Sequence, residues 1–392
     1  MVRHAGLSQW EAVVSTAFPH LSRPFARGLA WWSFGMAQIR GCGRRSVAMW
    51  FAFVLQIKVT TVEQRLYEWC VDATHKAGRQ RRTLDITTCF APLLAWVIRL
   101  WSGTQLALTL DATPLRDRFT CLTVSVVYRG NAIPVAWTIL HGNHRHAWNP
   151  EWIRMLGLLQ GVIPAAWTVL VLTDRGLWSP TIYRAIQAQG WHPFMRIRRQ
   201  GLVRPCSQSR FVAPDSLVTP QQPHWRGRVR AFKDTPIARQ LDTTLLVWTS
   251  AQHAEPWCIL TDLAPTACNA AWYALRAWCE QGFKSTKRGM WQWQQTQMRD
   301  PARAERLWLA LAVASLWLIS VGSAVEDAAL DGGSDLPALT GLWESGRRVL
   351  RLLRLGWLWL HAQQVNGQPL PLPERLIPDP WPLPRAIGGA VP

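Results

Sequence analysis

Residues 167–174 read WTVLVLTD, a nearly continuous apolar run that ends in an acid, Asp174. A run of this length is typical of a strand buried on both faces of a sheet. Upstream, residues 106–111 read LALTLD, and the alternation of Leu with smaller or polar residues predicts a half-buried strand that ends at Asp111. Open α/β sheets place their functional sites at the carboxyl ends of strands. The two acids therefore mark a candidate site.

The neighbouring segments predict an α/β sheet with covering helices. Residues 121–128 and 132–140 are β-rich and are separated by Arg129-Gly130-Asn131, which predicts a hairpin. Ser179-Pro180 predicts the start of a helix that Gly190 stops. The remaining expected elements are helices at about 150–162 and at 267–288, the second capped by Thr266, a strand over 194–199, and β-structure over 200–262.

The two flanks have helical patterns. Polar connectors divide the chain into expected domains 1–100, 101–330 and 331–392, the first boundary following the basic stretch HKAGRQRRT. A basic amphipathic helix is expected at about 340–365, with an extended proline-rich tail after it. The expected N-terminal helices cover 10–18, 29–39, 46–56 and 61–73.

One stretch, Leu307 to Val325, has nineteen residues without a charge. A bilayer span needs about 20 apolar residues, so length alone allows a membrane helix. The run is isolated and follows a charged helix start at Asp300, which favours a helix buried within a globular core and no membrane contact.

The charge balance points to an acidic macromolecular partner. Forty-three Lys and Arg against twenty-four Asp and Glu give a net charge of +19, and an excess of this size attracts polyanions. The eight cysteines form no Cys-x-x-Cys pair and no apolar signal segment opens the chain, which indicates reduced thiols and a cytoplasmic location. Twenty-six tryptophans are unusual, and composition does not say whether they build cores or bind bases.

Three acids lie in apolar elements. Asp111 and Asp174 end the two predicted strands, and Glu280 lies in the predicted helix WYALRAWCEQGF. A carboxylate at the end of a buried strand costs stability unless it is paired or bound to a metal. In the same helix, Tyr273, Arg276, Glu280 and Lys287 fall within about 60° of one another at 3.6 residues per turn. One acid, two cations and a phenol on one stripe suit the binding of phosphates beside an acid.

These residues resemble a known family, the DDE transposases of the insertion-sequence-four (IS-four) family of bacterial elements. Its signature, Y-x2-R-x3-E-x6-K, matches Tyr273, Arg276, Glu280 and Lys287 at every spacing. Asp111-Ala112-Thr113 resembles the family's first acid motif, and Asp174-Arg175 resembles its second. The resemblance covers residues 104–326.

The resemblance implies an RNase H-like catalytic core interrupted by a β-rich insertion at about 200–262, with a helical N-terminal domain and a helical C-terminal segment. Asp111, Asp174 and Glu280 would be the catalytic residues and would bind two Mg²⁺ (or Mn²⁺) ions that flank a scissile phosphate. The partners would be double-stranded DNA, as transposon ends and target, and a second copy of the chain in a synaptic homodimer.

Further roles follow from the same resemblance. Arg276 and Lys287 would contact DNA phosphates near the cut, and Tyr273 would hydrogen-bond to a phosphate or position a neighbour. Trp257 would stack on a flipped base, with Trp248 as the second candidate and burial in the sheet as the alternative. The N-terminal helices would bind transposon ends. Three other interpretations stay open: a transposase-derived DNA-binding protein without catalysis, an RNase H-like nuclease, and a different metal site at His141, His144 and His146.

Overall fold

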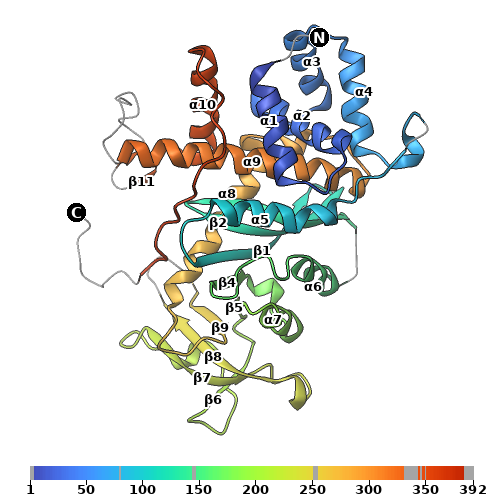
Figure 1. The fold of residues 1–392 in the computed structure, drawn as a ribbon. Helices are drawn as coiled ribbons and strands as arrows, with labels where there is room; N and C mark the ends of the chain where they lie inside the picture. The colour runs from blue at the N-terminus through green and yellow to red at the C-terminus, as the bar shows by residue number, and fades with distance from the viewer. Residues whose placement is uncertain are drawn as a thin grey trace.

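The protein is seen in a computed structural model that describes residues 4–78, 81–143, 147–249, 255–330 and 350–383, with the backbone of 343–344 and 347–348. One nine-stranded sheet forms its centre. The N-terminal helices gather at one end of the molecule, above a long helix that crosses beneath them, and the later strands of the sheet form the opposite end (Figure 1). The fold is therefore mixed α/β, as predicted.

The sheet has the strand order β3-β2-β1-β4-β5-β9-β8-β7-β6. Strands β1, β4 and β5 run parallel, and every other neighbouring pair is antiparallel. The strands are β1 (Gln105–Leu115), β2 (Phe119–Tyr128), β3 (Asn131–His141), β4 (Thr168–Thr173), β5 (His192–Arg196), β6 (Val203–Pro205), β7 (His224–Ala231), β8 (Leu241–Trp248) and β9 (Trp257–Thr261).

The helices largely follow the predicted positions. All four N-terminal helices, the helix after Ser179 and the long apolar helix are present, and the Ser179 hydroxyl accepts a hydrogen bond from the Ile182 N–H as a cap does. The helices are α1 (Ala5–Ala17), α2 (Arg23–Ile39), α3 (Arg44–Leu55), α4 (Val59–Cys70), α5 (Phe90–Leu100), α6 (Asn149–Leu158), α7 (Pro180–Gln187), α8 (Ala277–Lys284), α9 (Pro301–Leu330) and α10 (Leu352–Val365).

The two faces of the sheet differ in what they bury. On one face, which we call the core face, Leu110, Val171 and Met195 join the main hydrophobic core. On the other, the site face, Leu172 and Phe194 belong to a separate, smaller cluster. Because neighbouring residues of a strand point to opposite faces, the β1 positions of Thr109 and Asp111 share the site face.

Two predicted boundaries were wrong in the central region. The strand around residues 106–111 does not end at Asp111, because β1 continues to Leu115 and stays paired with β2. The predicted helix 267–288 is three segments, a 3-10 helix η6 (Ala270–Arg276), then α8, then a π-helical turn η7 (Ser285–Gly289). Its cap is Asn269 rather than Thr266, because the Asn269 side chain accepts from the Ala271 N–H.

A third wrong boundary lies near the C-terminus. The expected helix 340–365 begins only at Leu352, because the Trp343–Glu344 segment pairs antiparallel with Arg347–Arg348 as strands β10 and β11. The tail after α10 is extended, as expected, and it packs against the body of the protein. Leu376 is fully buried. Its N–H donates a hydrogen bond to the Leu100 carbonyl oxygen, and its own carbonyl oxygen accepts one from the Ser102 N–H.

Helix α9 is the one described helix that is long and apolar enough to cross a membrane, and 94% of its apolar window is buried within the protein. Helix α10 crosses it at a close contact between two glycines. A Cβ on Gly356 would lie 1.9 Å from the Leu318 carbonyl oxygen, so only glycine fits there. Trp317 of α9 stacks on Trp10 of α1 at 4.0 Å between ring centroids. This burial agrees with the predicted core helix.

Most of the tryptophan excess also belongs to the core. Nine tryptophans are among the twelve largest side chains that the described part of the structure buries almost completely. They come from the N-terminal helices, β3, α6, α9 and the segment before α9. Their role is therefore packing of the helical end of the molecule.

Candidate active site

The first predicted acid, Asp111, lies on β1 at the point where its parallel neighbour stops. The last paired residues of β1 and β4 are Leu110 and Thr173, so Asp111 and Asp174 each come one residue past that pair. Asp111 is 8% exposed, and one of its carboxylate oxygens accepts a hydrogen bond from the Ala112 N–H at 2.9 Å. The two acids are thus placed side by side by strand register.

Asp174 begins the short turn that follows β4. Its side chain accepts a hydrogen bond from the Gly176 N–H at 2.8 Å, which fixes the carboxylate at the sheet edge. The side chain is 39% exposed, so it is more accessible than that of Asp111. Here the predicted strand-end position is correct.

Segments η6 and α8 bring Tyr273, Arg276 and Glu280 to this edge. The buried Tyr273 hydroxyl donates to the carbonyl oxygen of Thr173 at 3.1 Å, which ties η6 to the end of β4. Burial raises the pKa of Tyr273, so the phenol keeps its proton at neutral pH. Arg276 is the last residue of η6, and Glu280 lies one turn further on, in α8. The Glu280 side chain is 60% exposed.

The guanidinium of Arg276 lies among the three acids. It contacts the carboxylate oxygens of Asp111 at 3.0 Å, Asp174 at 3.7 Å and Glu280 at 3.9 Å. The three acids come from three segments that are far apart in the sequence, and they meet at one cation. The tertiary structure therefore assembles all three predicted carboxylates and one of the two predicted cations, Arg276, into a single cluster.

The electrostatics of this cluster reflect its burial. Burial raises the pKa of Asp111, and the attraction of Arg276 offsets this only in part. Burial also disfavours the charged form of Arg276, but the neighbouring acidic groups, Asp111 first, outweigh it, and the pKa of Arg276 is raised. The site thus holds a surplus of negative charge around one fixed cation.

Lys287 and Trp257 lie beside this cluster rather than in it. Lys287 is on η7, and none of the three acids forms an ion pair with it among the described residues; burial lowers the pKa of Lys287. Trp257 of β9 is 8% exposed, and its ring contacts that of Tyr273 at 5.1 Å between centroids. Trp248, next to it at 5.0 Å, is the more exposed of the two.

Sequence reasoning missed a basic group near Asp174. Arg175 and Arg196 both contact Glu255, at 2.8 and 3.8 Å. With Arg198 and Arg199 they line a cavity of about 610 Å³. The available signal was the basic run MRIRRQ at residues 195–200, where β5 ends at the same sheet edge. Sequence reasoning also passed over Cys279, a buried thiol beside Asp111 whose pKa is raised by burial first and by that carboxylate.

Among the described residues, no group of three or more His, Cys, Asp or Glu side chains is placed to hold a metal ion. In the acidic cluster, each carboxylate is turned toward Arg276. His144 and His146 of the alternative metal site lie outside the described residues. Carboxylates are nevertheless the oxygen ligands that Mg²⁺ prefers, so the donor set fits a divalent cation.

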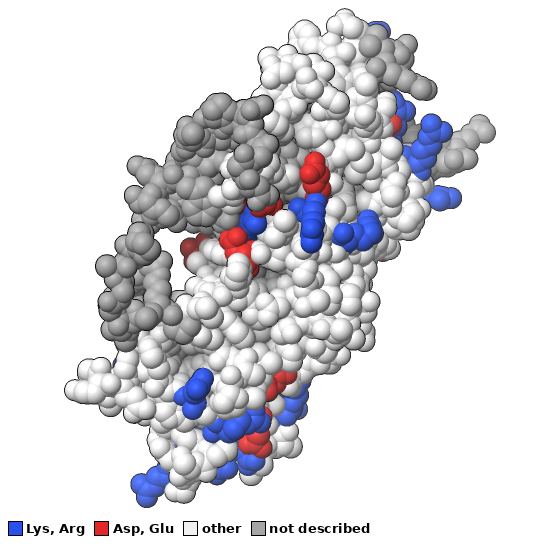
Figure 2. Space-filling view, turned by 60° about the vertical axis from the view of Figure 1, so that its left-hand side comes forward, with Lys and Arg blue, Asp and Glu red and all other residues white. Residues whose placement is uncertain are grey.

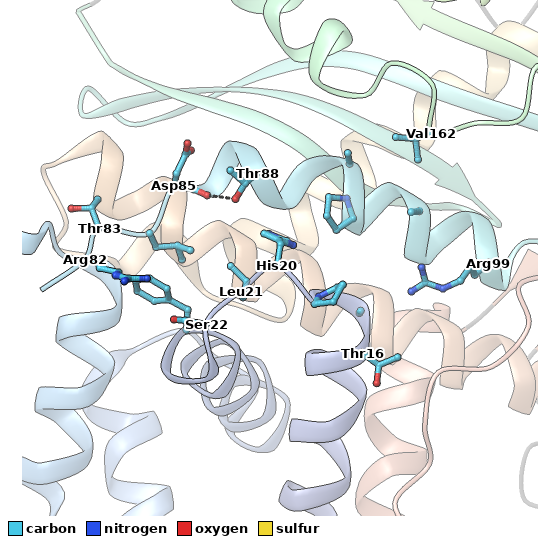
Figure 3. A pocket seen from close by; sticks show the side chains of 17 residues that line it. Thr16, His20, Leu21, Ser22, Arg82, Thr83, Asp85, Thr88, Arg99 and Val162 are labelled. Carbon is cyan, nitrogen blue, oxygen red and sulfur yellow. Dashed lines mark hydrogen bonds between the residues drawn. The ribbon is translucent and has the colours of Figure 1, made fainter. Parts of the chain in front are cut away.

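A larger cavity lies elsewhere. About 1060 Å³ in volume, it is a hollow open to solvent between the α1–α2 turn, the segment before α5 and α5 itself. Figure 3 shows His20, Arg82, Asp85 and Arg99 around it. None of the three acids lines it, so the cavity and the acidic cluster are separate features.

The sequence model of the family described as "Transposase DDE domain" matches residues 111–317, more than half of the chain. The chain belongs to this transposase family. A search of curated proteins found no match. The matched segment begins at Asp111 and contains Asp174 and Glu280.

Membership explains the main sequence features. A DDE-domain transposase is an enzyme that acts on DNA in the movement of a mobile element, and the family generally uses divalent metal ions. The predicted transposase function and DNA partner are confirmed at this level. The negatively charged phosphates of DNA are a partner of opposite sign for the net charge of +19.

Proposed function

We propose that this transposase, of the IS-four kind with the Y-R-E-K signature, binds the terminal inverted repeats of an insertion sequence. It cleaves the DNA there and joins the ends to target DNA. Asp111, Asp174 and Glu280 are the catalytic residues. The observation that carries this proposal is their convergence on Arg276 from three separate segments of the chain.

An RNase H-like core is part of the proposal, and strand order supports it. The first five strands run β3-β2-β1-β4-β5, with β1–β3 antiparallel and β4 and β5 parallel to β1. Strands β6–β9 are the β-rich insertion, and they extend the same sheet rather than forming a second one. On this basis residues 101–330 form the catalytic domain, between a helical N-terminal domain (1–100) and the C-terminal segment (331–392).

The residues at the cut would act as follows. Asp111, Asp174 and Glu280 would hold two Mg²⁺ or Mn²⁺ ions, which supply a lowered pKa for attacking water and stabilise the leaving 3′ oxygen. Asp111 is held by the Ala112 N–H and Asp174 by the Gly176 N–H, so both carboxylates are oriented by the backbone. Arg276 would contact a phosphate oxygen and offset its charge.

Tyr273, Lys287 and Trp257 have supporting roles in this proposal. Tyr273 holds η6 against β4 through Thr173 and so positions Arg276. Lys287, seven residues after Glu280 on η7, would contact a phosphate further along the cut strand. Base stacking by Trp257 remains a prediction that its small exposed fraction does not favour. The helices of residues 1–100 would bind the transposon ends, and two copies would act together as a homodimer on cytoplasmic DNA.

The decisive experiment uses Asp111→Asn, which removes the charge and keeps the shape. The substrate is a linear duplex carrying the inverted repeats found in the DNA that flanks the gene, incubated with Mg²⁺. We expect strand cleavage and joined products with the wild type and neither with the variant, while the mobility shift of the duplex persists. Metal-dependent cleavage by Asp111→Asn at the wild-type rate would refute the assignment.

The matched control is Asp117→Asn. This acid is exposed in the turn of the same β1–β2 hairpin, and its loss should leave cleavage unchanged. The cleaved product and the joined product distinguish a transposase from the two other interpretations. Cleavage without joining would identify a nuclease, and binding without cleavage would identify a DNA-binding protein derived from a transposase.

A further inference from the structure

The edge of the sheet farthest from β3 carries a row of arginines on the site face. Arg226, Arg228 and Arg230 alternate along β7 with residues that face the core, and Arg204 of β6 pairs with Arg230. Paired residues of antiparallel strands lie on the same face. We call these four residues, Arg204, Arg226, Arg228 and Arg230, the arginine face.

Little in the structure neutralises this group. Arg230 forms two hydrogen bonds with the Asp242 carboxylate, at 2.9 and 2.8 Å, and this pair lowers the pKa of Asp242. Arg226 and Arg228 are exposed, and neither forms an ion pair within the part of the chain that the structure describes. Four arginines and one aspartate leave a local charge of +3 for a partner outside the chain.

Strand register places the arginine face in line with the carboxylates. Asp111 and Asp174 follow the Leu110–Thr173 pair, and Arg196 follows the adjoining Thr173–Met195 pair. From Arg196 the same cross-strand row continues through its partner on β9 and then through β8 to Arg226. The complete row is Asp111, Asp174, Arg196, Ile259, Leu246 and Arg226, all on the site face.

The row spans five strand spacings, from β1 through β4, β5, β9 and β8 to β7. Neighbouring strands are about 4.8 Å apart, which puts Arg226 about 24 Å from Asp111. Duplex DNA rises about 3.4 Å per base pair, so this distance corresponds to about 7 base pairs. Residues 263–276 cover the middle of the row, so a duplex would pass over them.

Charged side chains gather in two groups on the face of the molecule drawn in Figure 2. Figure 2 shows acidic and basic atoms together at mid-height and a second, mainly basic group at the lower end of the same face. The surface between the two groups is mostly uncharged (Figure 2). A polyanion in contact with both groups would therefore meet no acidic barrier on the way.

We propose that the arginine face binds the phosphate backbone of duplex DNA about 7 base pairs from the bond cut at the carboxylates. This rests on the proposed function for the position of the cut, but the binding itself does not. Guanidinium groups present planar, paired donors that match phosphate oxygens, and each contact releases counterions. The DNA is either the transposon end, its flank or the target.

The first test measures binding of a fluorescent 40-base-pair duplex of random sequence by anisotropy, across a series of salt concentrations without metal. The variant combines Arg226→Gln and Arg228→Gln, the two exposed arginines. We expect the slope of log affinity against log salt to fall by about 2, because each phosphate contact contributes about 0.9. Arg226→Glu alone, which disturbs no ion pair, should weaken binding further than Arg226→Gln.

The matched control combines Arg184→Gln and Arg354→Gln. These arginines are exposed on α7 and α10, helices that pack into the main core, and their loss changes the net charge by the same two units. Unfolding temperatures of all variants are compared with that of the wild type. An equal slope change in both double variants would overturn the proposal, since only the net charge would then matter.

The second test locates the contact. Neutral methylphosphonates replace phosphates about 7 base pairs to either side of the cleavage site in the end duplex. Lower wild-type affinity with the inner substitution assigns the arginine face to the transposon end, and with the outer one to the flank. In a third arm the same substitutions are placed in the target duplex about 7 base pairs from the joining site, and reduced joining in that arm alone assigns the arginine face to target DNA. No effect in any arm contradicts the proposal, whereas the Asp111→Asn experiment tests the cleavage site separately.

Discussion

The core face and the site face of the sheet use the same strands for different purposes. On the core face, Leu110 and Met195 are fully buried in the main core. One residue away, Asp111 and Arg196 point to the site face and carry charge. Because side chains alternate along a strand, stability and chemistry can be assigned to neighbouring residues without competing for space. The pair Leu110 and Asp111 shows the difference most directly.

The largest expected effect on this comparison comes from Asp111→Asn. Cleavage of the end duplex should fall below detection, because one carboxylate of the three is lost. The unfolding transition should shift little, since the amide keeps the shape of the side chain and removes a buried charge. Denaturant unfolding measured by circular dichroism checks this, and a large loss of stability would show that the site face also holds the fold.

Leu110→Ala should do the opposite. Truncating a fully buried leucine costs about 2–5 kcal/mol of unfolding free energy, from lost burial and the cavity left behind. Cleavage measured well below the unfolding temperature should stay close to that of the wild type. If the variant instead keeps its stability and loses cleavage, the division of labour between the two faces is wrong.

A smaller effect is expected from Trp381→Ala, in the C-terminal tail. The Trp381 ring contacts Trp272 of η6 at 4.9 Å between centroids, and η6 carries Tyr273 and Arg276. Loss of this contact should loosen η6 and lower the cleavage rate several-fold, with DNA affinity unchanged. Trp381→Phe should restore the rate, because an aromatic ring keeps the contact. Equal rates for all three proteins would show that the tail does not support the site.

The smallest effect is expected from Asp242→Asn on the site face. The change removes the only acid paired with the arginine face in the described structure and raises its charge from +3 to +4. Random duplex DNA should then bind slightly more tightly, with a salt slope steeper by up to about 1. Unchanged binding would indicate that DNA does not reach β7 and β8.

The comparison also shows which positions could be predicted from sequence. The apolar run before Asp174 predicted β4 and its end, because a parallel strand buried on both faces needs no polar residues until it ends. Asp111 was harder, because Pro114 argues against a central strand. Beyond Leu110, however, β1 has a partner only on the β2 side, where a proline at the strand end is tolerated.

The Y-R-E-K helix is a second instructive case. The spacing of Tyr273, Arg276 and Glu280 indicated one face of one α-helix, and the side chains do meet at one site edge. The backbone of this segment changes from 3-10 to α to π geometry. The local sequence pattern did not predict these changes. Contacts with β4 and β1 override the local helical preference, since the buried Tyr273 hydroxyl needs the Thr173 carbonyl.

Local sequence patterns alone predict three acids in apolar elements, a basic surplus for a polyanion, and the alternating and helical periodicities of an α/β fold. The way in which those residues meet depends on tertiary contacts. Strand register set Asp111 beside Asp174 and aligned both with Arg226, and helix packing brought Arg276 between the acids. Such relations depend on contacts between distant segments, which local sequence patterns do not encode.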